Sequence, residues 1–153
     1  MALFQTISDN LLKLIEESAP KLKNINPEKA ADKSVNTWSI KEILGHLIDS
    51  ATNNHHRFVK AQQVEQYQIE PYDQPFWVNS QRYNDAPWHE LIDLWQLYNQ
   101  HLARVISYIP DSKQTIPCHM NESDVISFGF LVEDYVHHMG HHLQQIKERM
   151  VPS

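Results

Sequence analysis

The stretch Ser39-Ile-Lys-Glu-Ile-Leu-Gly-His-Leu-Ile-Asp-Ser-Ala51 carries the marks of a helix beginning. Ser39 followed three positions later by Glu42 is a capping box, in which each side chain satisfies a backbone N–H of the first turn. Apolar residues then recur at helical spacing at Ile43, Leu44, Leu47, Ala51 and Phe58. The pattern predicts an amphipathic helix from Ser39 to about Phe58.

Three further segments show the same spacing, at about Leu3–Ile25, Pro87–Tyr108 and Ser127–Met150. Pro20 is expected to kink or interrupt the first of them, whereas Pro87 suits a first helical turn. The chain has only three glycines and no Asn-Gly or Asp-Gly pair, which disfavours β-hairpins. Four helices, with a long loop over 68–86 joining the second to the third, predict an all-α four-helix bundle with a long crossover.

Composition limits the classes of function. A chain of 153 residues is sized for one domain, here 1–153, and its net charge of −6 disfavours binding to nucleic acid or to anionic membranes. Cys118 is the only cysteine, so an intrachain disulfide is impossible. We expect a cytoplasmic protein, because we find neither a signal peptide nor a membrane-spanning segment.

The predicted last helix contains Val136-His-His-Met-Gly-His-His-Leu143, which holds four of the ten histidines. Two i,i+4 pairs are present, and such a pair places two imidazoles on one face within reach of one ion. The apolar stripe of this helix leaves His137 and His141 on the solvent side. We therefore expect the pair His138 and His142 to be half-buried.

The helix after Ser39 has a polar lane beside its apolar face, formed by His46, Ser50, Asn53 and Arg57. His46 is the lane's metal-ligating side chain, so three histidines plus water is the natural coordination, with zinc as the expected metal. Histidine-rich helices also arise as surface decoration. The other histidines, His55, His56, His89, His101 and His119, have no partner at metal spacing along the chain and are expected at the surface or in loops.

These blocks together resemble the DinB superfamily, and within it the branch of bacillithiol S-transferases and YfiT-like metal-dependent hydrolases. The matching residues follow one another in order from about Ile7 to Lys147: Trp38 to Ser50, Asn53, Asn54, Arg57-Phe58, Ile69-Glu-Pro-Tyr-Asp73 with Trp77, and His138-Met-Gly-His-His142 with Ile146.

The resemblance implies a four-helix bundle in which His46, His138 and His142 bind a zinc or nickel ion. It further implies that the ion activates a low-molecular-weight thiol for attack on an electrophilic small molecule, and that two copies of the chain form a homodimer. Gln145 stands where related sequences often carry another histidine.

Several other residues are candidates for supporting roles. Arg57 is a candidate contact for a substrate carboxylate or phosphate, although an exposed arginine is an equal alternative. A second set of candidates is Tyr72, Asp73 and Trp77. They either form a lid over the metal or simply pack on the bundle. The residues expected to hydrogen bond to the ligand rings are Asp49, Ser50, Asn53 and Gln145. Cys118 is a bystander, a fourth ligand or a reactive thiol, with the first alternative favoured.

Three functions remain open from the sequence. The first is a metal-dependent enzyme, either a thiol S-transferase or a hydrolase or isomerase that uses the same ion. The second is a non-catalytic stress-response bundle whose metal serves folding, and the third is a helical interaction module without metal.

Overall fold

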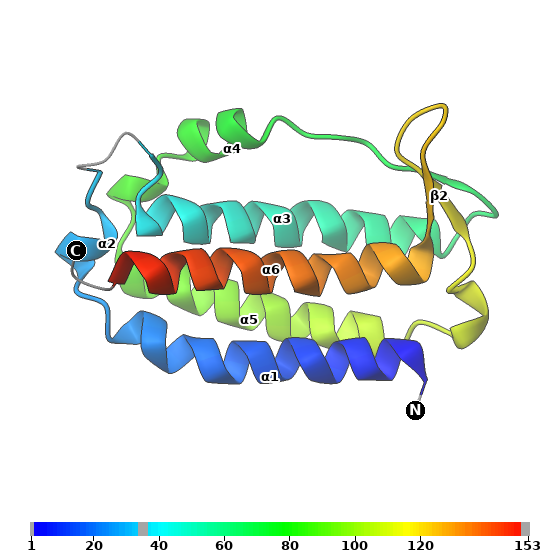
Figure 1. The fold of residues 1–153 in the computed structure, drawn as a ribbon, viewed down its shortest axis with the longest axis horizontal. Coiled ribbons are helices and arrows are strands. Elements are labelled where there is room, and N and C mark those ends of the chain that lie inside the picture. Colours follow the sequence, from blue (N-terminus) through cyan, green and yellow to red (C-terminus); the bar gives the residue numbers. More distant parts are fainter. Residues whose placement is uncertain (1, 34–36, 151–153) are drawn as a thin grey trace.

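The computed structural model describes residues 2–33 and 37–150. Its four long helices are α1 (Leu3–Lys23), α3 (Ile40–Ala61), α5 (Trp88–Ser107) and α6 (Phe128–Met150) (Figure 1). Helices α1 and α3 each pack on both α5 and α6, so α1 and α3 lie diagonally opposite one another. The expected all-α four-helix bundle is confirmed.

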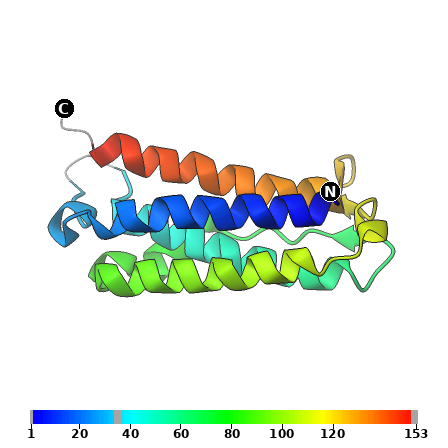
Figure 2. The ribbon, with the colours of Figure 1, turned by 90° about the horizontal axis from the view of Figure 1, so that it is seen from below.

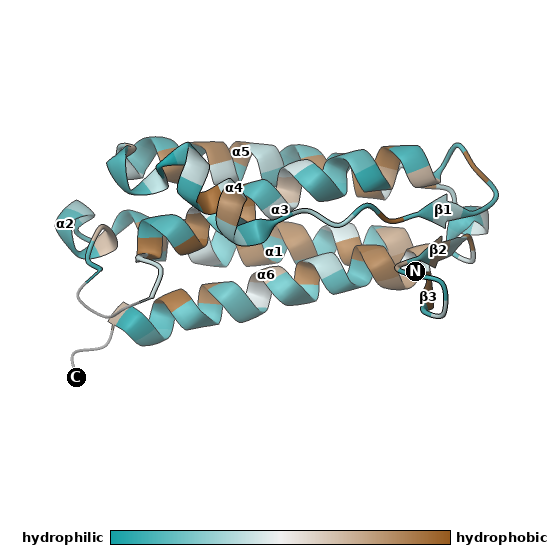
Figure 3. Cartoon of the chain, turned by 90° about the horizontal axis from the view of Figure 1, so that it is seen from above, coloured by the Kyte–Doolittle hydropathy of each residue, from teal (hydrophilic) through white to brown (hydrophobic). Residues whose placement is uncertain are grey.

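The directions of the helices follow from one long crossover. Helices α3 and α5 run the same way along the bundle, whereas α1 and α6 run the opposite way (Figures 1 and 2). The segment between α3 and α5 therefore returns along the whole length of the bundle, passing above α3 and α6 (Figure 3). This return places a third layer over the α3–α6 face.

Helix α3 begins as its capping box predicts. The Glu42 backbone N–H donates to Ser39 Oγ at 3.1 Å, and the Ser39 N–H donates to a Glu42 carboxylate oxygen at 2.9 Å. Pro20 lies inside α1 without ending it, because only three residues follow it in the helix and little backbone bonding is lost. Pro87 is the residue before α5 rather than its first residue.

The crossover is more ordered than the loop that the sequence predicted. It contains α4 (Gln74–Gln81) and a 3₁₀ turn at Tyr83–Asp85. Asp73 caps α4 by accepting a hydrogen bond from the Phe76 N–H at 3.1 Å, and a proline occupies the first turn. Both signals were present in the sequence, but eight residues carry too little periodicity to mark a helix. A four-residue helix, α2 (Pro27–Ala30), follows α1.

A small sheet at one end of the bundle was also not predicted. Strand β2 (Pro117–His119) pairs in parallel with β1 (Tyr67–Gln68) and antiparallel with β3 (Val125–Ser127). Strands of two or three residues are too short for an alternating pattern to identify them. The sheet ties the start of the crossover to the segment that leads into α6.

The core lies between the four long helices. Its fully buried side chains include Leu11, Leu44, Phe58, Trp95, Leu102, Phe128 and Val132. None of the helices in the described ranges is both long enough and apolar enough to cross a membrane.

Candidate metal centre

The three predicted ligands come together between α3 and α6. His46 is 3% exposed on α3, and His142 is half-buried on α6, as predicted. His138 is exposed, so the prediction that it is half-buried was wrong. The ring centroid of His142 lies 4.8 Å from that of His46 and 5.4 Å from that of His138. With Zn–N bonds of about 2 Å, two imidazoles on one tetrahedral ion have centroids about 5 Å apart. The observed spacings match that value.

The ring of His142 lies close to those of His46 and His138 at steep angles. They meet edge to face, at 77° for the first pair and 70° for the second. As they stand, no three His, Cys, Asp or Glu side chains in residues 2–33 and 37–150 are arranged to hold a metal ion. Because His138 is exposed, rotation about its two side-chain torsions would meet little resistance.

His46 has the electrostatic character of a metal ligand. Burial, followed by the neighbouring His142 and His138, lowers its pKa to about 4, so its ring is neutral at neutral pH. Its Nδ1 is buried and has no hydrogen-bond partner in residues 2–33 and 37–150. An unsatisfied buried nitrogen destabilises a fold unless something binds it, and neutral imidazole is the form that ligates metals. The donor set and this unpartnered atom therefore fit a divalent metal ion.

His142 is held by its neighbour Gln145. The Gln145 side-chain oxygen lies 3.1 Å from His142 Nδ1 and can accept its proton, which leaves the Nε2 lone pair available to an ion. Burial lowers the pKa of His142, against the opposing effect of this hydrogen bond, and favours the neutral ring. The outer pair, His137 and His141, is exposed, as the apolar stripe predicted.

The other three residues expected to support the ligands have different roles, so those predictions were wrong. Among the described residues, Asp49, Ser50 and Asn53 make no hydrogen bond to a histidine ring. The Asn53 amide donates to the backbone oxygen of Asp49 at 2.9 Å, and the backbone oxygen of Ser50 accepts from Asn54 at 2.8 Å. Polar side chains in helix interiors often bond to the preceding turn in this way.

Asp49 anchors the crossover rather than a ligand. The Tyr83 hydroxyl donates to its Oδ1 at 2.6 Å, and the Gln81 amide donates to the same oxygen at 2.8 Å. Burial raises the pKa of Asp49, against the lowering effect of both hydrogen bonds. Tyr83 reaches this position because α3 has Gly45 beneath it. A Cβ on Gly45 would lie 2.2 Å from Tyr83 Cδ2.

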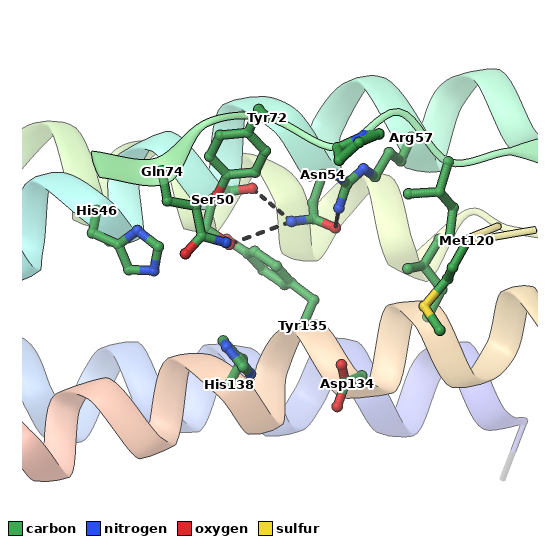
Figure 4. A pocket seen from close by; sticks show the side chains of 13 residues that line it. His46, Ser50, Asn54, Arg57, Tyr72, Gln74, Met120, Asp134, Tyr135 and His138 are labelled. Atoms are coloured by element: carbon green, nitrogen blue, oxygen red, sulfur yellow. Dashed lines mark hydrogen bonds between the residues drawn. The ribbon is translucent and has the colours of Figure 1, made fainter. Parts of the chain in front are cut away.

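A cavity of about 310 Å³ lies beside the histidines, between α3, α6 and the crossover. His46 and His138 line one end of it from opposite walls, and Arg57 and Met120 line the other end (Figure 4). The polar side chains between these ends are Ser50, Asn54, Tyr72 and Gln74. The arrangement gives a small molecule access to His46 and His138.

The three proposed lid residues occupy different positions. Tyr72 lines the cavity, and Trp77 packs against its ring with centroids 5.5 Å apart. Asp73 is the cap of α4 and has a structural role. The cavity roof is therefore Tyr72, supported by Trp77.

The surroundings of Cys118 and of two further histidines, His55 and His101, are also defined by the structure. The Cys118 thiol is fully buried in β2 and lies 3.7 Å from the Ile116 carbonyl. Burial raises its pKa to about 11, so the thiol is protonated at neutral pH, which favours the bystander interpretation. His55 and His101, expected to lack partners, have ring centroids 5.4 Å apart, because α3 and α5 bring them together.

The chain is similar to known proteins over most of its length. The model of the DinB superfamily matches residues 2–146. A Bacillus subtilis (strain 168) protein named "Putative metal-dependent hydrolase YfiT" is 26% identical over 147 residues, covering 92% of this chain and 82% of that protein.

A solved structure gives the same result for the fold. It is described as YfiT from Bacillus subtilis, "a probable metal-dependent hydrolase with an unusual four-helix bundle topology". It superposes with a TM-score of 0.78 at 22% identity, covering 93% of this chain and 85% of the other. With the family model matching nearly the whole sequence, the chain belongs to the DinB superfamily.

Proposed function

We propose that the protein is a metal-dependent enzyme in which His46, His138 and His142 bind one divalent ion, most simply zinc. The observation that carries this proposal is the pair of ring spacings, 4.8 and 5.4 Å, at the end of a cavity open to a small molecule. Three protein ligands leave a fourth coordination position for a reactant, which is the arrangement of catalytic rather than structural zinc sites.

The reaction we propose is the transfer of a low-molecular-weight thiol to an electrophile. A divalent ion held by His46, His138 and His142 would lower the pKa of a low-molecular-weight thiol, so that the thiolate would be present near neutral pH. The sulfur then bonds to an electrophilic carbon, the leaving group departs with the electrons of the broken bond, and the thiol proton goes to solvent.

The chain's own residues support this chemistry by holding and covering the reactants. His46 stays neutral because its pKa is about 4, so protons do not compete for its lone pair. Gln145 fixes the orientation of His142. Tyr72 covers the cavity and restricts water, while Asp49 and Tyr83 hold the crossover down on α3. These roles need no general base from the protein.

A hydrolase that uses the same ion is the second candidate, and the relative from Bacillus subtilis favours it because that protein is named as a metal-dependent hydrolase. Water would take the coordination position that the thiol takes in the first candidate. The two candidates share the metal site and differ in the nucleophile.

Metal analysis of the purified protein, beside His138→Ala, tests the common part. We expect about one ion per chain in the wild type and much less in the variant, and a wild type without stoichiometric metal would contradict the proposal. The metal-loaded protein is then assayed with a panel of thiols, bacillithiol included, and an aryl halide. Loss of free thiol favours the transferase, whereas cleavage of ester or amide substrates without thiol favours the hydrolase.

A further inference from the structure

Two opposite charges that do not neutralise each other line the cavity, Arg57 at the end remote from His46 and Asp134 one helical turn before His138. Arg57 projects from α3 and Asp134 from α6, on opposite walls (Figure 4). Neither side chain forms an ion pair within 4 Å among the described residues. A cavity with one uncompensated charge on each wall offers complementary partners to a ligand that carries both signs.

Arg57 is positioned by neutral groups. One of its nitrogens donates to the Glu70 backbone carbonyl at 2.8 Å, and its guanidinium carbon lies 5.9 Å from the centroid of the Tyr72 ring. A second nitrogen is 3.5 Å from the Asn54 side-chain oxygen. These contacts hold the guanidinium at the cavity and leave its charge available. Guanidinium groups bind carboxylates through paired, charge-assisted hydrogen bonds.

Asp134 provides the negative charge on the wall opposite Arg57. Its carboxylate is exposed on α6, one turn before His138, and it lines the same cavity. It repels a second anionic group beside the one held by Arg57 and attracts an ammonium group. A ligand end that carries an ammonium and a carboxylate on one carbon meets both walls.

The separation of the two ends sets the length of the ligand. His46 and Arg57 are eleven residues apart on α3, which is about 16 Å along the helix axis. The reach of both side chains shortens this span, and on the opposite wall Asp134 lies only about 6 Å along the α6 axis from His138. A ligand that contacts both Arg57 and His46 therefore extends along the cavity.

We infer that the cavity binds an elongated zwitterion, with an α-amino-acid group between Arg57 and Asp134 and its reactive end at the histidines. This inference names the substrate class of the proposed thiol transferase and rests on that function for the chemistry at the reactive end. The charge recognition itself rests only on residues of the chain.

The test uses three thiols of nearly equal shape. N-(2-mercaptoethyl)-L-glutamine carries both charges, N-(2-mercaptoethyl) glutaramate lacks the ammonium, and N-(2-mercaptoethyl)-4-aminobutanamide lacks the carboxylate. Calorimetric titration of the wild type should give the tightest binding for the first probe. The loss should be about tenfold or more without the carboxylate and about threefold without the ammonium. Equal affinity for all three overturns the inference.

Variants without the charge test whether Arg57 and Asp134 cause the binding preferences. Charged residues near them on the same helices serve as matched controls. Arg57→Gln should remove the preference for the carboxylate, whereas Lys60→Gln, an exposed cation on the same helix, should not. Asp134→Asn should remove the preference for the ammonium, whereas Glu133→Gln should not. Control variants that act as strongly as the variants they match would reduce the effect to net charge and overturn the inference.

The titrations are run on metal-free and on metal-loaded protein, and the metal content of every variant is measured. Charge preferences that persist in the metal-free protein support the inference even if the wild type proves to bind no stoichiometric metal, which would defeat only the proposed function. Stoichiometric metal together with equal binding of the three probes would defeat only the inference.

Discussion

Helix α3 carries histidines on two of its faces, and the surroundings of the two groups differ. The α3–α6 group consists of His46, His138 and His142, and the α3–α5 group consists of His55, His56 and His101. Ring spacing alone does not separate them, because closest centroids are 4.8 Å apart in the first group and 5.4 Å apart in the second. A metal site requires more than proximity of imidazoles.

The difference lies in the nitrogen atoms. In the α3–α6 group, His46 Nδ1 is buried without a partner in the part of the chain that the structure describes, and Gln145 supports the ring of His142. In the α3–α5 group, His55 Nδ1 already has the Tyr98 hydroxyl at 2.8 Å, and the rings of His56 and His101 are exposed to water. An unsatisfied buried nitrogen beside a cavity favours an ion, whereas a satisfied or hydrated one does not.

The largest expected effect is on metal binding. Substituting alanine for His138 or His142 should lower the affinity by more than the roughly 10–100-fold typical of residues that merely support a ligand. Alanine at His55 or His101 should leave it unchanged. Metal content after dialysis, followed by calorimetric titration of the apo-proteins, measures both. Equal losses in the two groups would break the comparison.

The second effect concerns the crossover, which covers the α3–α6 face of the bundle. Gly45→Ala places a Cβ 2.2 Å from Tyr83 Cδ2, so the tyrosine must move from its hydrogen bond with Asp49. We expect a loss of about 1–3 kcal/mol in the free energy of unfolding, as for overpacking elsewhere.

Gly140→Ala on α6 is the matched control for that substitution. Its Cβ would meet only a Leu14 methyl group, at 3.9 Å. Helix propensity then predicts a gain of up to about 1 kcal/mol. Urea unfolding of both variants decides the matter, and a neutral Gly45→Ala would show that the crossover is not fixed on α3 as described.

The sequence was sufficient for the parts of the molecule that local patterns encode. The capping box at Ser39 located the start of α3, and the apolar stripe of α6 separated His142 from the exposed pair His137 and His141. Periodicity along a helix reports which face is buried, so both predictions needed only neighbouring residues.

Contacts between segments far apart in the sequence could not be predicted from helical periodicity. Asp49 was expected beside a histidine, but its partner is Tyr83, 34 positions away, and only the path of the crossover brings them together. The meeting of His55 with His101 depends similarly on how α3 packs on α5. The glycine at position 45 was the available signal, since a glycine inside a helix often marks a close approach.

A smaller effect is expected at the support of His142. Gln145→Ala removes the acceptor of the Nδ1 proton and should weaken metal binding by about tenfold, since the ring loses both orientation and basicity. Gln144→Ala, an exposed neighbour on α6, should have no effect. Titration of both apo-proteins with zinc compares them. Equal affinities would remove Gln145 from the site.

The smallest effect is the pH dependence of the metal-free protein, and it separates the two groups by burial alone. In the folded chain the pKa of His46 is lowered from 6.5 to about 4, so between these values the unfolded chain binds more protons. The contribution of His46 to the free energy of unfolding is therefore fully present above about pH 6.5 and is lost as the pH falls toward 4.

The pKa of His55 is also lowered, first by burial and then by His101 and His56, but its ring is less buried. His46→Gln should accordingly flatten the change in unfolding free energy between about pH 7 and pH 5 more than His55→Gln does. If the two variants flatten it equally, the burial of His46 does not distinguish it, and the argument that an ion satisfies its nitrogen loses its basis.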